Sequence, residues 1–306
     1  MRRSFIIAVS LLAGCRPHGA DNARAKERLF ARAGDPRSLT AAPVAIDLRT
    51  LGGSPTAQDA LLEMTETDAA ERVGSFRLQA KLSLRFEGSG QTFAIDEERL
   101  VEQSKTGDLH LRIHDADGGG MEILWFGGKA YGRSRYGNYV ARDRQSGLGE
   151  QRDEVFGALR TLYLMADRAF VLRGLGPADG CERFEIRRGD PRSAGAPPRF
   201  QGRLDSDTTR RFQFVYGRQL TQANGELCVD PRGFVRRAHV SLRWSAAGDA
   251  GSGTIQAELT ETTSDLGGEV HLAAPENPEP EPHRPRGPFA TLSRFGFVAR
   301  PDGGQD

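Results

Sequence analysis

The side chains that could carry out chemistry are few and widely spaced. His110 and His114 have the spacing of two zinc ligands on a helix, but they fall in a segment that alternates apolar and polar residues as a strand does. Four residues along a strand span about 13 Å, which is too far for two ligands of one ion. We therefore interpret both histidines as solvent-facing polar residues beside Arg112, and we expect no metal site.

No catalytic motif is found in the sequence. It has no Gly-x-Ser-x-Gly elbow, no phosphate loop ending in Gly-Lys-Ser/Thr, no His-Glu-x-x-His and no dinucleotide fingerprint. The run Asp115–Gly118 begins as a calcium loop does, but Phe126 stands where the bidentate Glu would be required. We interpret this run as a turn. We expect a binding or structural protein with no catalytic residue and no cofactor.

Two of the three cysteines, Cys181 and Cys228, lie in the second half of the chain. In an oxidising compartment they would most economically form a disulfide. The closed loop of about 48 residues would then contribute roughly 4 kcal/mol to stability. Two separate buried thiols are the alternative. A metal pair is disfavoured because neither cysteine has a Cys-x-x-Cys or His neighbour at ligand spacing.

The third cysteine, Cys15, closes a segment that is typical of a secretion signal. A basic start, Met1–Arg3, precedes an apolar run, Phe5–Leu11, that is too short to span a bilayer as a helix. The run Leu12–Cys15 (Leu-Ala-Gly-Cys) resembles the lipobox of bacterial lipoproteins, in which the chain is cut before the cysteine and the thiol receives a diacylglycerol. This implies that residues 1–14 are a signal peptide and that Cys15 is lipidated. An ordinary secretory signal and a cytosolic chain with an apolar start are the alternatives.

Lipidation at Cys15 would place the protein at a membrane surface. One acyl chain binds only marginally, so stable attachment needs two or more, and a modified Cys15 would carry that many. Arg16 stands where enterobacterial lipoproteins retained at the inner membrane have Asp. By this resemblance we expect the periplasmic face of the outer membrane, if the envelope is Gram-negative. The sequence has no second long apolar run, so no transmembrane helix is expected.

The charge balance excludes some classes of partner. The chain has 42 basic and 41 acidic residues, and loss of residues 1–14 with Arg2 and Arg3 would leave 40 against 41. A near-zero net charge argues against a dedicated nucleic-acid binder and against a polybasic membrane-surface protein. The 37 glycines and 38% hydrophobic residues suit one β-rich domain with polar flanks.

Residues 15–55, in which Ala, Arg, Gly and Pro predominate, are predicted to form a flexible tether. The predicted helices and strands begin after it. Apolar spacing predicts a helix from Thr56 through Val73, stopped by Gly74. The segment 76–87 then alternates apolar and polar residues throughout, which predicts a long strand with one dry face.

Further strands and one further helix are predicted after this strand. Periodic apolar residues predict a helix between 152 and 172, stopped by Gly174 and Gly176. Short turns separate the strands, which favours an antiparallel meander. The predicted strands are residues 92–101, 109–114, 121–126, 129–131, 181–187, 211–216, 225–229, 234–244, 254–263 and 269–272.

The composition changes after residue 274. Six prolines between 275 and 288 predict an extended, largely disordered tail without helix or strand over residues 275–306. Its apolar end, residues 289–298, could dock on this domain or on a protein partner, or it could have no function.

The order of elements over residues 56–274 resembles the LolA-like superfamily of periplasmic lipoprotein carriers and its lipid-binding lipoprotein relatives of the LppX and LprG type. The residues that carry the resemblance are Val73–Phe76, Gly107–Leu109, Gly127–Tyr131 and Thr262–Gly267. The resemblance implies an α+β fold: a strongly curved antiparallel β-sheet, an open half-barrel, with helices covering the concave face. Between sheet and helices it implies an apolar cavity for acyl chains.

A set of apolar side chains would face that cavity. They are Phe76, Leu78, Ala80, Leu82, Leu84, Phe86, Leu109, Leu111, Ile113, Leu159 and Leu162. We expect a membrane-anchored envelope lipoprotein that binds or transfers a lipid, a lipoprotein acyl chain or another amphiphile. Packed fully, the same residues would form a solid core, and the alternative is a structural or adaptor lipoprotein that engages a protein partner. The anchor departs from the carriers, because a soluble shuttle must leave the membrane.

Overall fold

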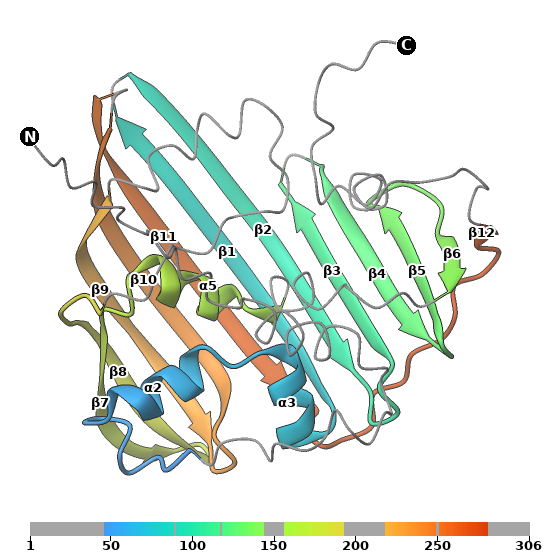
Figure 1. The fold of residues 1–306 in the computed structure, drawn as a ribbon, viewed down its shortest axis with the longest axis horizontal. Coiled ribbons are helices and arrows are strands. Elements are labelled where there is room, and N and C mark those ends of the chain that lie inside the picture. The colour runs from blue at the N-terminus through green and yellow to red at the C-terminus, as the bar shows by residue number, and fades with distance from the viewer. Residues whose placement is uncertain are drawn as a thin grey trace, which may run out of the picture.

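The sheet is the main body of the protein. The computed structural model describes residues 46–88, 90–116, 118–143, 156–192, 218–248 and 251–280. In these residues twelve strands form one open sheet, with the helices on one side of it (Figure 1). All neighbouring strands are antiparallel except the short pair β12 and β6. The expected fold class, an open curved antiparallel sheet with covering helices, is confirmed.

The strands follow the chain in two meanders that meet in the middle of the sheet. Their order is β12-β6-β5-β4-β3-β2-β1-β11-β10-β9-β8-β7. Their bounds are β1 (Phe76–Gly88), β2 (Gln91–Gln103), β3 (Leu109–Asp115), β4 (Gly120–Phe126), β5 (Lys129–Ser134), β6 (Val140–Asp143), β7 (Phe170–Ala178), β8 (Cys181–Arg188), β9 (Arg218–Asp230), β10 (Phe234–Gly248), β11 (Gly251–Ser264) and β12 (Glu279–Pro280).

Strand β1 sets the two faces of the sheet. Its side chains alternate between buried and exposed or half-buried positions, as predicted. Strand β1 pairs with β2 on one side and with β11 on the other, and residues that lie opposite each other point to the same face of the sheet. Glu97 and Leu259 lie opposite Leu82, so their side chains point to the same face as that of Leu82. We call the face to which Leu82 points, where the helices lie, the concave face. Arg77 and Lys81 point to the other, convex face, where they pair with Glu102 and Glu98 of β2.

The helix expected from Thr56 to Val73 is two helices, α2 (Pro55–Leu62) and α3 (Glu66–Val73). The chain breaks between them because Thr65 caps α3. The Thr65 Oγ1 accepts the Asp68 N–H at 3.1 Å, and the Thr65 N–H donates to Asp68 Oδ2 at 3.1 Å, which is a capping box. The spacing of four between apolar residues continues across the break and conceals it.

The second predicted helix is also shorter than expected. Within the described residues α5 spans Ala158–Met165, and residues 152–155 lie outside them. The chain turns at Asp167 and Arg168, both with positive φ, and continues as β7. Gly174 and Gly176 therefore do not stop a helix but flank a bulge in this strand.

The end of the chain differs from the prediction at two points. Residues 269–272 form no strand. Glu279 and Pro280 form a short parallel bridge to β6, although the prolines were expected to exclude strand here. Pro280 is accommodated because an edge strand does not need every N–H, and the Glu279 N–H donates to Tyr139 O at 2.7 Å. The predicted strand 211–216, the tail from 281 on and residues 1–45 lie outside the described residues.

Ionic contacts fix the helices to each other. The Tyr163 Oη of α5 donates to Asp59 Oδ1 of α2 at 2.6 Å, and Arg192 Nη2 donates to the same oxygen at 2.9 Å. Arg168 pairs with Glu63, which follows α2. Each charge in this half-buried network has a partner, so the network holds α2 and α5 as one layer.

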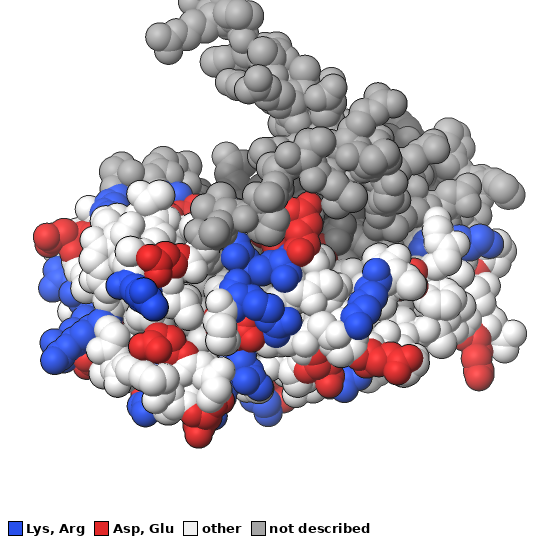
Figure 2. Space-filling view, turned by 90° about the horizontal axis from the view of Figure 1, so that it is seen from below, with Lys and Arg blue, Asp and Glu red and all other residues white. Residues whose placement is uncertain are grey.

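The surface carries both charge signs. Seen from below, basic and acidic side chains lie side by side over the described part of the molecule (Figure 2). Such intermixing agrees with the near-neutral balance of the sequence.

Cys181 and Cys228 form a disulfide, with Cα atoms 5.5 Å apart. It joins two adjacent strands, β8 and β9. Both cysteines are buried, so the disulfide lies inside the domain.

Replacing both Cys181 and Cys228 by Ala should lower the free energy of unfolding by about 4 kcal/mol, because the cross-link restricts the unfolded chain over a separation of 47 residues. Urea unfolding of the oxidised wild type and the double variant measures the difference. A reductant should destabilise the wild type and leave the double variant unchanged. Equal stability of the two oxidised proteins would contradict the prediction.

Candidate functional site

The concave face presents a continuous apolar surface. Every residue that the sequence analysis assigned to the acyl-chain site is buried, either on this face or in the helix above it. Their neighbours in the sheet extend the surface to both sides. The buried apolar residues of this surface in strands β1 to β4 are Phe76, Leu78, Ala80, Leu82, Leu84, Phe86, Val101, Leu109, Leu111, Ile113, Ile123 and Trp125.

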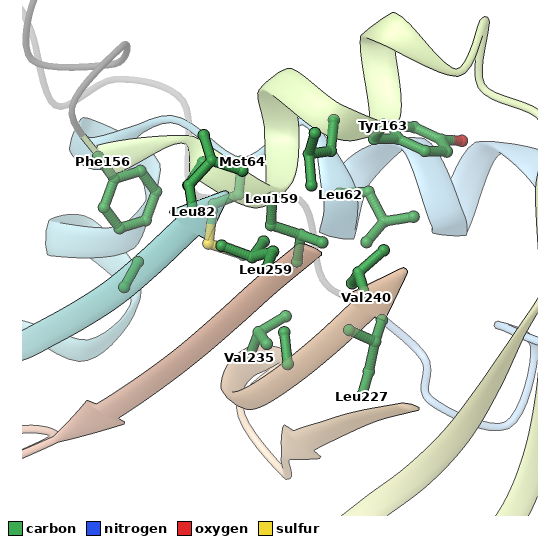
Figure 3. Packing of buried hydrophobic residues seen from close by; sticks show 14 of the residues in the cluster. Leu62, Met64, Leu82, Phe156, Leu159, Tyr163, Leu227, Val235, Val240 and Leu259 are labelled. Atoms are coloured by element: carbon green, nitrogen blue, oxygen red, sulfur yellow. The ribbon is translucent and has the colours of Figure 1, made fainter. Parts of the chain in front are cut away.

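The described helices lie over one half of this face. Helix α5 contacts β11, and α3 contacts β10. Figure 1 shows no described helix over β4 or β5. In the covered half the side chains are closely packed: Leu159 of α5 lies among Leu82, Leu259 and Met64 (Figure 3), and Leu162 is fully buried. Beneath α5 the structure therefore has a packed core where a cavity was expected.

A charged pair lies on the concave face. Arg99 is opposite Ala80, and Glu97 is opposite Leu82, so both side chains of β2 point to the apolar side. The Arg99 side chain is only 2% exposed. Its Nη2 and Nε donate to Glu97 Oε2 at 2.7 and 3.0 Å. The pair neutralises both charges, which is what burial in an apolar surface requires.

Glu261 is a second acid on this face. It lies in β11 between Ala80 of β1 and Ala238 of β10, and it is 5% exposed. Its carboxyl accepts a hydrogen bond from the backbone of Leu159 in the first turn of α5. Its Oε2 has no hydrogen-bond partner within the part of the chain that the structure describes. Burial raises the pKa of Glu261 to about 8, and the nearby Arg99 lowers it less strongly.

Sequence reasoning missed these three residues, although the sequence contains a signal for them. Ile95, Glu97, Arg99 and Val101 follow one another at intervals of two, so their side chains point to the same face of the strand. Glu97 and Arg99 are therefore charged residues at positions where the alternation calls for apolar ones. Glu261 follows Leu259 at the same spacing of two. A charge at an inward position is costly unless it is paired, so such a break in the alternation marks a candidate site.

The histidines lie on the convex face beside Arg112, and both are half-buried. His110 is 17% and His114 22% exposed. Both approach Glu122 of β4 from opposite ends: His114 Nε2 is 3.3 Å and His110 Nε2 3.9 Å from its carboxylate. Tyr139 and Arg133 donate to Glu122 Oε2 at 2.6 and 2.7 Å.

The Glu122 carboxylate is therefore held ionised. Burial alone would raise the pKa of Glu122, but the nearby His110 and the hydrogen bonds donated by Tyr139 and Arg133 outweigh it and hold the pKa well below its usual range. The network ties β3, β4 and β5 together on the convex side. In the described ranges no group of His, Cys, Asp and Glu is arranged to hold a metal ion.

None of the helices in the described segments is long and apolar enough to cross a membrane.

Comparison with known proteins gives structural similarities only. No protein-family model and no curated protein matches the sequence. A DUF1329 family protein from Desulfovibrio piger is 10% identical, with a TM-score of 0.22, over 68% of this chain and 91% of that protein. A LolA superfamily protein from Nitrosomonas europaea is 9% identical, with a TM-score of 0.20, over 69% of this chain and 96% of that protein.

MucB, in the MucA/MucB complex of Pseudomonas aeruginosa, is a third similar structure. It is 15% identical, with a TM-score of 0.21, over 69% of this chain and 58% of the matched chain. The LolA superfamily, which the sequence resembles, is thus represented among the similar structures.

Replacing Glu261 by Gln should stabilise the protein. Because burial raises the folded pKa to about 8, the wild type loses stability as pH rises from the unfolded pKa towards that value. Gln cannot ionise and keeps the acceptor for Leu159, so the gain at pH 8 and above should be on the order of a few kcal/mol. Urea unfolding as a function of pH measures it.

Glu258→Gln is the matched control, because Glu258 lies on the exposed face of the same strand. It should change stability by less than about 0.5 kcal/mol over the same range. If Glu261→Gln and the wild type showed the same dependence on pH, Glu261 would not be a buried acid.

Proposed function

We propose that this chain is a lipid-anchored envelope protein that binds the acyl chains of a lipid or another amphiphile on its concave face. The supporting observation is that the apolar surface is wider than the described helical layer. Helices α3 and α5 contact β10 and β11. The buried apolar residues Leu111 of β3 and Ile123 and Trp125 of β4 lie at least three strands away from β11.

An acyl chain suits this surface for physical reasons. An apolar face of a sheet must be covered by something apolar, and the cover need not be protein. Each methylene of an acyl chain that leaves water contributes about 0.8 kcal/mol. The concave face of β3 and β4 offers Leu, Ile and Trp side chains, with no charged group between Leu109 and Ile113 on that face. Ligand sites of this kind are mostly apolar with a few polar groups.

The anchor is the second part of the proposal. Residues 1–45 lie outside the described residues, so its support is the sequence alone: a basic start, a short apolar run and the lipobox-like Leu12–Cys15. With Arg16 after the cysteine, the proposed location is the periplasmic face of the outer membrane. An anchored protein would hold or hand over its ligand close to the membrane.

A ligand-free adaptor is the second candidate function. The packed core beneath α5 (Figure 3) favours it, because a filled core needs no ligand. In addition, Val171 and Leu175 on β7, at the edge of the sheet, are 42% and 47% exposed. An exposed apolar edge strand is a common place for a protein partner to bind.

Photo-crosslinking distinguishes the two candidates. Delipidated protein is incubated with palmitate carrying a diazirine on its chain, irradiated, digested and sequenced by mass spectrometry. The proposal predicts labels on the concave residues of β3 and β4, such as Leu111 and Ile123, and competition by unlabelled palmitate. Labels on the convex neighbours His110 and Arg112, or none above those on unfolded protein, would contradict it.

Cys15→Ser should move the protein from the membrane fraction to the soluble fraction, because Ser cannot form the thioether that carries the acyl chains. Fractionation and immunoblotting of the expressing cells measure the shift. The double variant Cys181→Ser and Cys228→Ser should remain with the membrane. Membrane association of Cys15→Ser equal to that of the wild type would show that another part of the chain attaches it.

A further inference from the structure

We propose that His110 is a proton-controlled tie: as an imidazolium it links β2 to β4 across the convex face, and its deprotonation loosens the outer strands β3, β4 and β5. The inference goes beyond the proposed function and does not depend on it, because it concerns the face opposite the acyl-chain surface. It is drawn from the acceptors on both sides of the ring, from a ring nitrogen that lacks a partner and from the build of this half of the sheet.

The His110 ring lies between two carboxylates. Its Nδ1 is 2.8 Å from Glu102 Oε2 on β2, and its Nε2 is 3.9 Å from Glu122 Oε2 on β4. An ionised carboxylate can only accept hydrogen bonds, so Nδ1 carries a hydrogen and donates to Glu102. In the neutral ring Nε2 then presents a lone pair to a second acceptor. This nitrogen is buried and has no hydrogen-bond partner among the described residues. An imidazolium, with an N–H at both ends, matches both carboxylates.

Both carboxylates are kept ionised by other groups. Arg77 of β1 donates to Glu102 Oε1 at 2.8 Å, and Arg133 and Tyr139 donate to Glu122 Oε2. The proton therefore belongs on the ring. Burial opposes a charged ring, but the hydrogen bond with Glu102 and the proximity of Glu122 outweigh it and raise the pKa of His110 above its ordinary value of 6.5.

The groups around the ring come from every strand packed beside it. The charged and titratable side chains on this part of the convex face are Arg77, Glu98, Glu102, Arg112, His114, Glu122, Tyr131, Arg133, Arg135, Tyr139 and Asp265. Burial and the positive charges of Arg112 and Arg135 lower the pKa of His114. His114 is therefore neutral at neutral pH, and His110 is the histidine that can supply a positive charge to Glu122.

The tie joins two groups of contacts. Arg77 and Glu102 belong to β1 and β2, whereas Glu122, Arg133 and Tyr139 belong to β4, β5 and the chain after β5. His110 lies between them on β3. The outer strands β3, β4 and β5 have 7, 7 and 6 residues, against 13 in β1 and in β2, and no described helix covers β4 or β5 (Figure 1). Short strands without such a cover open more readily, so they depend on contacts of this kind.

The tie acts above about pH 6.5. Because the pKa of His110 is raised in the folded state, its stabilisation is complete below the unfolded-state value and is lost as pH rises through the folded-state value. His114 has a lowered pKa, so its effect has the opposite sign and lies below pH 6.5. Glu261 also reduces stability as pH rises towards about 8, but it does so equally in variants of His110, and their comparison removes it.

Hydrogen exchange of the backbone amides in the delipidated, folded full chain measures the opening of the outer strands. Between about pH 6 and about pH 9, protection factors in β3 and β4 should fall by about tenfold in the wild type, the factor that corresponds to one charge-assisted hydrogen bond. Protection factors are already corrected for the intrinsic effect of pH on exchange. His110→Gln cannot take up a proton, so it should lack the additional protection at pH 6. His239→Gln, at an exposed position on the convex face of β10, is the control and should respond as the wild type does.

The wild type also gives a direct reading, which does not require His110→Gln to fold. The ¹⁵N chemical shifts of the imidazole distinguish an imidazolium from either neutral tautomer. His110 should be an imidazolium at pH 6.5 and should lose its proton above that value. A neutral His110 ring at pH 6.5 would overturn the proposal, as would equal protection of β3 and β4 in the wild type and His110→Gln at pH 6.

A second measurement keeps this inference apart from the proposed function. Leu111 and Ile123 belong to the strands that open, so an acyl chain bound there should leave faster when the tie is lost. The methyl ester of cis-parinaric acid is a fluorescent acyl chain without a titrating group, and its release rate should rise by the same factor between pH 6 and pH 9. If protection falls as expected and the probe does not bind, the tie stands and the proposed function is contradicted. If the probe binds and protection does not respond to pH, acyl-chain binding stands and the tie is overturned.

Discussion

Burial of one face of β1 is the constraint on which the rest of the structure depends. This strand lies in the middle of the sheet and pairs along most of its length with β2 and β11. Its strict alternation therefore decides which side chains of both neighbours point to the concave face. Each fully buried leucine contributes about 1.5 to 3 kcal/mol. A shift of one residue in register would expose all of the buried side chains, from Phe76 to Phe86, at once.

The helical layer and the charged groups follow from that face. Helix α5 packs its leucines on the sheet, and the contacts of Tyr163 and Arg192 with Asp59 hold it to α2. Against this apolar background Glu261 is a destabilising residue, because a buried acid resists ionisation. Proteins commonly keep such residues where function requires them, at some expense in stability.

Strong local patterns were predictable from the sequence, and long-range ones were not. The strand at β1 and the turn after Asp115 were predicted because alternation and turn residues are local signals. The break at Thr65 was missed because apolar spacing continues across it. Phe170 was assigned to a helix because its spacing from the preceding apolar residues also fits a helical period.

The candidate site was predicted in part for a similar reason. The apolar residues of the concave face are evident from alternation. The pairing of Arg99 with Glu97 and the contact of Glu261 with Leu159 join strands and a helix that are far apart in sequence, so only the fold brings them together. Whether those apolar residues contact a ligand depends on whether a cavity remains between their side chains. The periodicity of a sequence does not specify this.

The central claim is that acyl chains occupy the concave face, and native mass spectrometry of the Cys15→Ser variant tests it most directly. Without the covalent anchor, any lipid that remains with the folded protein is bound non-covalently. The account predicts a co-purifying species that contains an acyl chain and is released on unfolding. A folded variant that is recovered free of lipid, and that does not take up an acyl-chain lipid when one is supplied, would contradict the claim.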